Sequence, residues 1–126
     1  MEALNPENSE TRQNNQDAER ENLEQMLEDL KSRLMAEKCY ENLVVRSGDS
    51  NTGRFYSFSL NQITPGGWFK RAEEKPLLTV DGIFNGGGFG ERYLLAHFID
   101  SDIRDVVKKH LEEYREEQGL TAVHYH

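Results

Sequence analysis

The sequence predicts an α+β fold in which an N-terminal amphipathic helix and a C-terminal helix accompany an antiparallel sheet of four or five strands. Three observations carry this prediction. Leucines recur at spacings of 4, 3 and 4 near the N-terminus, the hydrophobic period falls to about 2 after Cys39, and a helical period returns after Asp100. Strands gathered in the middle of a chain, between helices, are typical of the α+β class.

The first part of the chain is strongly polar. Between Asn5 and Asn22, Ala18 is the only hydrophobic residue. Such a segment cannot bury enough apolar surface to offset the entropy lost on ordering. We therefore expect residues 1–22 to form a disordered or frayed acidic arm and residues 23–126 to form a single α+β domain.

Four leucines form a stripe on the expected first helix, which occupies residues 23–38 of the domain and has helical periodicity from about residue 17. They are Leu23, Leu27, Leu30 and Leu34. Their spacing suits two arrangements, one in which the stripe packs on this protein's own sheet and one in which it pairs with a second copy as a short coiled coil. Because two heptads are too few for an independent coiled coil, the predicted homodimer would also need contacts between the globular parts.

The expected sheet spans residues 40–99. Its clearest strand is 54–60, where alternation places Tyr56, Phe58 and Leu60 on one face and Phe55 on the other. A glycine within the last strand but one, Gly82, predicts a bulge or a close approach of another segment. The further strands are expected at 43–45, 68–71, 77–84 and 92–99, in an order that alternation does not determine.

The second helix is expected at residues 101–118. Asp100 and Asp102 suit its N-terminal cap, and Gly119 suits the left-handed position just after its end. The tail, residues 119–126, is apolar enough to pair with the sheet or dock on it.

Composition narrows the class of protein. The net charge is −8, which disfavours a general affinity for nucleic acid or anionic membranes. The single cysteine, Cys39, allows no internal disulfide, and no apolar run resembles a signal peptide or a membrane span. We expect a cytoplasmic or nuclear protein in which Cys39 is structural or incidental.

One stretch of this acidic chain is locally basic. Residues 50–72 contain three basic residues and no acid, interleaved with aromatic residues. We predict that this stretch forms a recognition surface for a protein partner on one sheet face, and single-stranded nucleic acid on the same face is the alternative. The predicted contact residues are Arg54, Phe55, Trp68, Phe69, Lys70 and Arg71.

A glycine-rich loop supports a second alternative, the binding of a phosphate-containing small molecule. The candidate anion-binding residues are Gly86, Gly87, Gly88, Gly90 and Arg92. The loop lacks the Lys and Ser/Thr of a Walker phosphate loop, and a glycine is missing three positions after Gly88, where a dinucleotide fingerprint requires one. A long hairpin connection explains the same glycines.

The sequence contains no recognisable catalytic motif. No serine lies in a nucleophile elbow, and no acid and histidine are placed to activate such a serine. The pair His124 and His126 supplies two of the four ligands that a structural zinc site needs. We expect a protein that is not an enzyme and uses neither a cofactor nor a metal.

Overall fold

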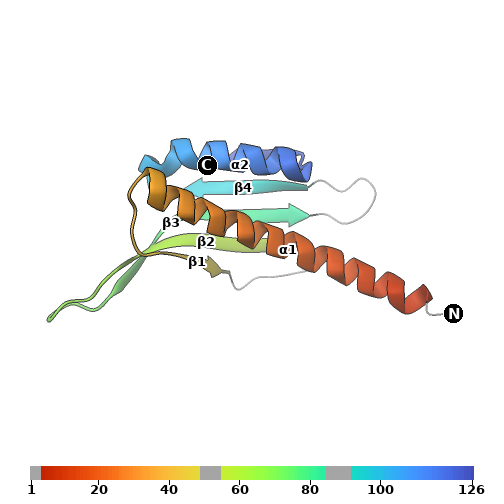
Figure 1. Ribbon diagram of the computed structural model, residues 1–126, viewed down its shortest axis with the longest axis horizontal. Coiled ribbons are helices and arrows are strands. Elements are labelled where there is room, and N and C mark those ends of the chain that lie inside the picture. The colour runs from red at the N-terminus through yellow and green to blue at the C-terminus, as the bar shows by residue number, and fades with distance from the viewer. Residues whose placement is uncertain (1–3, 49–54, 85–91) are drawn as a thin grey trace.

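The computed structural model describes residues 4–48, 55–84 and 92–126, and it has the predicted α+β architecture (Figure 1). The five strands form one sheet in the order β1-β2-β3-β4-β5, antiparallel except for the parallel pair β4 and β5. The elements are α1 (Leu4–Glu37), β1 (Leu43–Ser47), β2 (Phe55–Thr64), β3 (Glu73–Phe84), β4 (Arg92–Phe98), the 3-10 turn η1 (Ser101–Ile103), α2 (Arg104–Gln118) and β5 (Ala122–Tyr125).

Helix α1 starts earlier than the sequence predicts. Its 34 residues begin at Leu4, where a disordered or frayed arm was expected through residue 22. Glu, Gln and Arg, which are frequent in this segment, are good helix formers even where no apolar face is present. The first turns extend past the sheet (Figure 1), and the role of residues 1–22 as an arm separate from the domain stays a prediction.

The end of α1 is set by backbone geometry. The Tyr40 and Lys38 amides both donate to the carbonyl oxygen of Leu34, at 3.4 and 2.9 Å, which closes the last turn. Cys39 has a φ of 59°, the left-handed conformation that glycine usually supplies at this position. The single cysteine is exposed and acts here as a helix-ending residue.

The leucine stripe packs on this protein's own core. Leu23, Leu27, Leu30 and Leu34 are each 0% exposed, and they join one cluster with the covered face of the sheet. The structure thus has the first of the two arrangements that the spacing allows. The structure contains no coiled coil in the residues it describes, and the homodimer stays a prediction.

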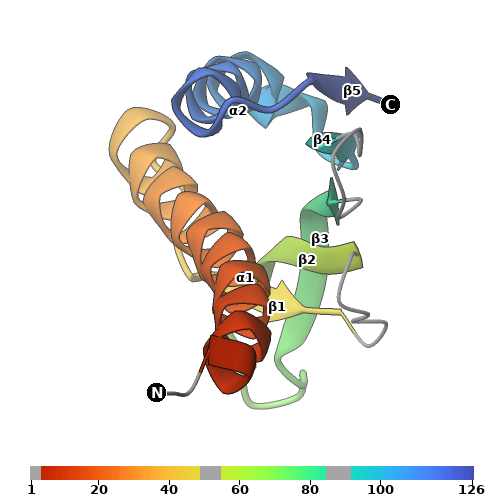
Figure 2. The same ribbon diagram turned by 90° about the vertical axis from the view of Figure 1, so that its right-hand side faces the viewer.

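Both helices lie on the same side of the sheet (Figure 2). On this covered side, Phe58 and Leu60 of β2 face Leu78 and Val80 of β3, and all four are nearly fully buried. The other face carries Phe55 and Asp81, which are half-buried, and neither helix lies on it. Alternation along β2 was therefore predicted correctly, with the Tyr56 side as the core.

Gly82 of β3 lies close to Leu23 of α1. A Cβ atom built on Gly82 would lie 2.9 Å from Leu23 Cδ2 and 2.8 Å from Phe84 Cε2. The register shift of the sheet lies elsewhere, between Leu60 and Asn61. Of the two predictions for Gly82, the close approach is confirmed and the bulge is wrong.

The C-terminal elements follow most of the predicted signals. The Asp100 side chain accepts from the amide of Asp102 at 2.9 Å and caps the 3-10 turn η1, whereas α2 itself begins at Arg104 and has no side-chain cap. Gly119 has a φ of 65° after the end of α2, as predicted. The tail pairs with the sheet as β5, with Val123 beside Leu94. Helix α2 therefore acts as the crossover that a parallel pair of strands requires.

One predicted strand is wrong. Residues 68–71 lie in the connection between β2 and β3, and β3 begins at Glu73, before the expected start at Leu77. Aromatic residues favour strands, but this connection is too long for a two-residue hairpin turn, so the aromatics fall in the loop.

Candidate functional site

The strands β2 and β3 continue beyond both helices as a protruding two-stranded arm (Figure 1). We call residues 61–76 the hairpin arm and residues 65–72, its connection, the tip. Every residue from 64 to 76 is exposed. The arm therefore adds little to the core, and its side chains are available to a partner.

The tip is a closed loop. The Gly67 amide donates to the carbonyl oxygen of Lys70 at 3.0 Å. A Cβ atom on Gly66 would lie 2.7 Å from that same oxygen and 2.8 Å from the amide nitrogen of Ala72. Because these neighbours are backbone atoms, which cannot rotate away, only glycine fits at position 66.

Two large aromatic side chains project from this loop. Trp68 is 97% exposed and Phe69 is 96% exposed, whereas the other large hydrophobic residues in the exposed class, Met35 and Ile99, are about half exposed. Lys70 follows directly, and it has no ion-pair partner among the residues that the structure describes. Adjacent exposed aromatics of this size are unusual, because Trp and Phe each carry roughly 150–250 Å² of surface that water solvates poorly.

The base of the arm is held by an ion pair on the open face of the sheet. Arg46 of β1 donates twice to Glu74, from Nε at 3.0 Å and from Nη2 at 2.9 Å. The Asn61 amide donates to the same carboxylate at 2.5 Å. Hydrogen bonds from Arg46 and then Asn61 hold the pKa of Glu74 below its usual range, so the carboxylate stays charged near neutral pH. Three strands are thereby joined where the arm leaves the sheet.

This anchor was not predicted from the sequence. Arg46 and Glu74 are 28 positions apart, and only the strand register brings them together. Neither residue lies in a strand that the sequence predicts, and the sequence gives no register by which to pair them.

The predicted partner-binding residues do not form one surface. Trp68, Phe69, Lys70 and Arg71 are together in the tip, whereas Phe55 lies at the opposite end of β2 on the open face, beside Ile83. The ten residues of β2 separate the two places by about 30 Å, at roughly 3.3 Å per residue. Arg54 lies outside the described residues.

The candidate anion loop also lies outside the described residues, apart from Arg92 at the start of β4. Arg92 donates to Glu19 from Nε and to the carbonyl oxygen of Gln118 from Nη1, both at 3.0 Å. Its guanidinium also lies 5.8 Å from the centre of the Phe84 ring. These contacts occupy Arg92 in joining α1, β4 and the end of α2.

The histidines are dispersed within the described structure. His110 packs between the two helices, and the His124 ring makes an edge contact with Tyr93 at 5.6 Å. In the described ranges, no three His, Cys, Asp or Glu side chains are grouped to hold a metal ion. Neither helix, over its described length, has an apolar stretch long enough to cross a membrane.

Comparison of the chain with protein-family models, with curated proteins and with solved structures gave no match. The candidate site is therefore argued from its geometry alone.

Proposed function

We propose that this chain is a non-enzymatic binding module that recognises a protein partner with the tip of its hairpin arm. The exposure of Trp68 and Phe69 carries the proposal. Tryptophan is among the residues that most often dominate binding energy, because it buries a large area and has few rotatable bonds to fix.

The charges of the tip define the kind of partner. Two apolar rings side by side need an apolar pocket, and Lys70 and Arg71, which follow them, favour acidic residues around its rim. The rest of the chain is strongly acidic, so it would repel an extended acidic surface. The partner chemistry that fits is an apolar pocket with a local acidic rim.

The expected affinity follows from the buried area. Two rings that each bury about 150–250 Å² contribute roughly 4–6 kcal/mol each at about 25 cal/mol per Å². Association itself costs about 4–15 kcal/mol. A tip acting alone therefore gives at most a micromolar complex, and the homodimer predicted from the sequence would strengthen it by presenting two tips.

A double variant of the tip, Trp68→Ser with Phe69→Ser, tests the proposal. Both side chains are outside the core, so the free energy of unfolding should change by less than about 0.5 kcal/mol. Proteins that are cross-linked to the wild-type chain in a cell extract and lost with the double variant are the candidates. The matched control is Met35→Gln, which removes an exposed apolar side chain on α1 instead.

Each candidate partner is then purified and titrated. Trp68 is the sole tryptophan, so its emission reports on the tip directly and should shift to the blue on binding. Truncation of Trp68 should weaken binding by about 30-fold or more, the loss of about 2 kcal/mol that defines a dominant contact. A double variant that binds every partner as tightly as the wild type contradicts the proposal.

Nucleic acid is tested in parallel with a labelled mixed-sequence single-stranded oligonucleotide at about 50 and about 200 mM salt. Stacking of bases on Trp68 and Phe69 with phosphates on Lys70 would give binding that weakens steeply with salt. Such binding, if lost in the double variant, would replace the protein partner with single-stranded nucleic acid.

A further inference from the structure

The strand β5 forms one edge of the sheet, beside α2 (Figure 2). In a parallel pair, alternate residues of a strand turn their backbone N–H and C=O groups toward the neighbouring strand. His126, which directly follows β5, turns toward β4, since its amide donates to the carbonyl oxygen of Ala96 at 2.8 Å and its carbonyl oxygen accepts from the Phe98 amide at 3.2 Å. The backbone groups of Val123 and Tyr125 therefore point away from β4, toward the open edge.

This edge lacks the features that usually keep an edge strand from pairing with another chain. Those features are long charged side chains, prolines and bulges. Residues 122–125 are Ala, Val, His and Tyr, and their register with β4 is regular from Tyr93 to Ala96. The strand at the opposite edge, β1, differs because it contains the charged Arg46. The open edge of β5 is therefore suited to receive a further strand.

Helix α2 covers the two strands at this edge. The Arg104 guanidinium lies 5.4 Å from the centre of the Phe98 ring of β4. One turn further on, Lys108 Nζ lies 5.1 Å from the centre of the Tyr125 ring of β5. Two strands are about 10 Å wide, and packed helices lie about 8–10 Å apart. If a second β5 continued the sheet, the two α2 helices would therefore lie side by side.

The side of α2 that borders this edge carries charges of both signs. Tyr125 contacts Lys108 and also donates from its hydroxyl to the Glu112 carboxylate at 2.9 Å. The spacing of Lys108, Glu112 and Glu116 puts all three on the same side of the helix. Glu112 is neutralised within its own chain by Arg115, at 2.8 Å. Lys108 has no ion-pair partner among the residues that the structure describes, and the Glu116 side chain is 76% exposed with only a 4.0 Å contact to Arg115.

We propose that β5 pairs antiparallel with β5 of a second copy of this chain, so that the two five-stranded sheets form one continuous sheet. A twofold axis through His124 sets Val123 of one copy opposite Tyr125 of the other. Both residues point their backbone groups outward, so each of these two pairs exchanges two hydrogen bonds. The side chains of each pair lie on the covered face, where an aromatic residue beside a β-branched one is a favourable cross-strand pair.

The charges of α2 favour a second copy over a strand of an unrelated protein. Tyr125 lies beside Lys108 and Glu112, so an axis through the preceding residue of β5 passes near Glu112. Lys108 and Glu116 are equally far from this axis, each about 6 Å along the helix at about 1.5 Å per residue. Lys108 of each copy therefore faces Glu116 of the other. A second copy supplies this match by symmetry, whereas an unrelated strand does not bring it.

The test is sedimentation of the full chain at protein concentrations from about 1 to about 300 µM, the range in which small interfaces dissociate. Val123→Pro removes the outward amide and leaves the hydrogen bonds between β5 and β4 in place. Its control is Val123→Thr, which keeps both the amide and the β-branched shape. Circular dichroism checks that each variant is folded.

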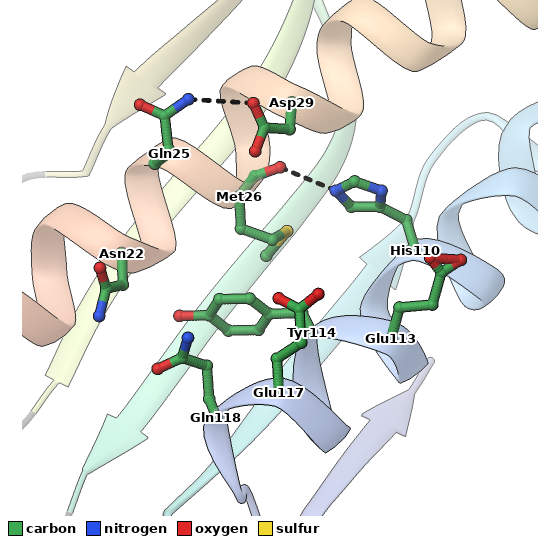
Figure 3. A pocket seen from close by; sticks show the side chains of 9 residues that line it. All are labelled: Asn22, Gln25, Met26, Asp29, His110, Glu113, Tyr114, Glu117 and Gln118. Atoms are coloured by element: carbon green, nitrogen blue, oxygen red, sulfur yellow. Dashed lines mark hydrogen bonds between the residues drawn. The ribbon is translucent and has the colours of Figure 1, made fainter.

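The facing charges are tested on α2. Glu116→Lys sets two lysines against each other, and adding Lys108→Glu to it restores unlike charges across the axis. The matched control is Glu117→Lys, the same charge change on the next residue, whose side chain lines the groove between α1 and α2 instead (Figure 3).

We expect a wild-type dimer that dissociates within this concentration range. Val123→Pro should weaken it at least about tenfold, and Glu116→Lys about tenfold, because the reversed charge acts twice in a twofold dimer. The charge swap should return the dissociation constant to within about threefold of wild type, and both controls should stay within about twofold.

The double variant of the tip, Trp68→Ser with Phe69→Ser, should dimerise like the wild type, so this result does not depend on the proposed function of the tip. A monomer at every concentration, or a dimer that is lost with the tip variant, would overturn the proposal. So would a dimer that Val123→Pro leaves unchanged or a charge swap that does not rescue Glu116→Lys. If Val123→Pro does not fold, the rescue by Lys108→Glu still decides.

Discussion

Replacing Gly82 with alanine tests whether α1 is seated on the sheet. The added methyl group would lie 2.9 Å from Leu23 Cδ2 and 2.8 Å from Phe84 Cε2, and both side chains are buried. Overpacking of this kind costs about 1–3 kcal/mol, while removing a glycine from a strand returns about 0.5–1 kcal/mol. The difference of these two ranges runs from about 0 to about 2.5 kcal/mol, so we expect Gly82→Ala to lower the free energy of unfolding by about 1 kcal/mol.

The assay is urea denaturation followed by far-ultraviolet circular dichroism, because the sole tryptophan lies in the exposed tip and does not report on the core. Gly67→Ala is the control, since a Cβ there would meet nothing within 4 Å. In a Leu23→Ala background the cost of Gly82→Ala should shrink, by at least about 0.5 kcal/mol, because the contacting methyl group is gone. A Gly82→Ala variant that is more stable than the wild type would refute the packing of Leu23 against Gly82. Pairing of the leucine stripe between two copies of the chain would then be the better model.

Two further predictions concern the end of α1. Cys39→Gly should raise the free energy of unfolding by about 0.5–1 kcal/mol, because Cys39 has a left-handed φ that glycine adopts without strain. Cys39→Ala keeps the Cβ atom and should change the free energy of unfolding little. Equal urea midpoints for the two variants would show that the backbone at Cys39 is not strained. Burial, together with a 2.7 Å hydrogen bond to Asp100, raises the pKa of Tyr40 to about 12, whereas an unfolded tyrosine ionises near about 10. The folded state holds its proton longer, so the stability that Tyr40 contributes is complete below about pH 10 and is lost as the pH rises toward about 12. Tyr40→Phe should flatten this fall in alkaline urea titrations, and an unchanged slope would show that the phenol does not contribute.

Local signals in the sequence predicted most of the fold. The left-handed Gly119 and the alternation along 55–60 depend on neighbouring residues alone, and both are confirmed. The cap at Asp100 is also present, on the 3-10 turn η1 that precedes α2. The leucine spacing was equally local, but it fits a sheet and a partner helix alike. Only the tertiary structure, with Leu23 above Gly82, distinguishes these two surfaces.

The candidate site was harder to predict. The contact role of Trp68 and Phe69 stays a prediction, and their sequence did not show whether the two aromatic residues lie in a strand or in a loop. The prediction that Phe55 shares a surface with Trp68 and Phe69 is wrong. An extended strand lies between them, and residues near each other in the sequence can be far apart along such a strand.

The separation between the tip and the core has a consequence for how this protein can diversify. Trp68 through Arg71 are all exposed, so most substitutions there are nearly neutral for stability, within about 0.5 kcal/mol. Mutation and selection can therefore change the side chains of the tip, and with them the target that we propose for it, without first gaining stability elsewhere. Gly66 is the exception, because the loop backbone leaves no room for a side chain there. A lineage that keeps this glycine can vary the next few residues while the rest of the fold stays unchanged.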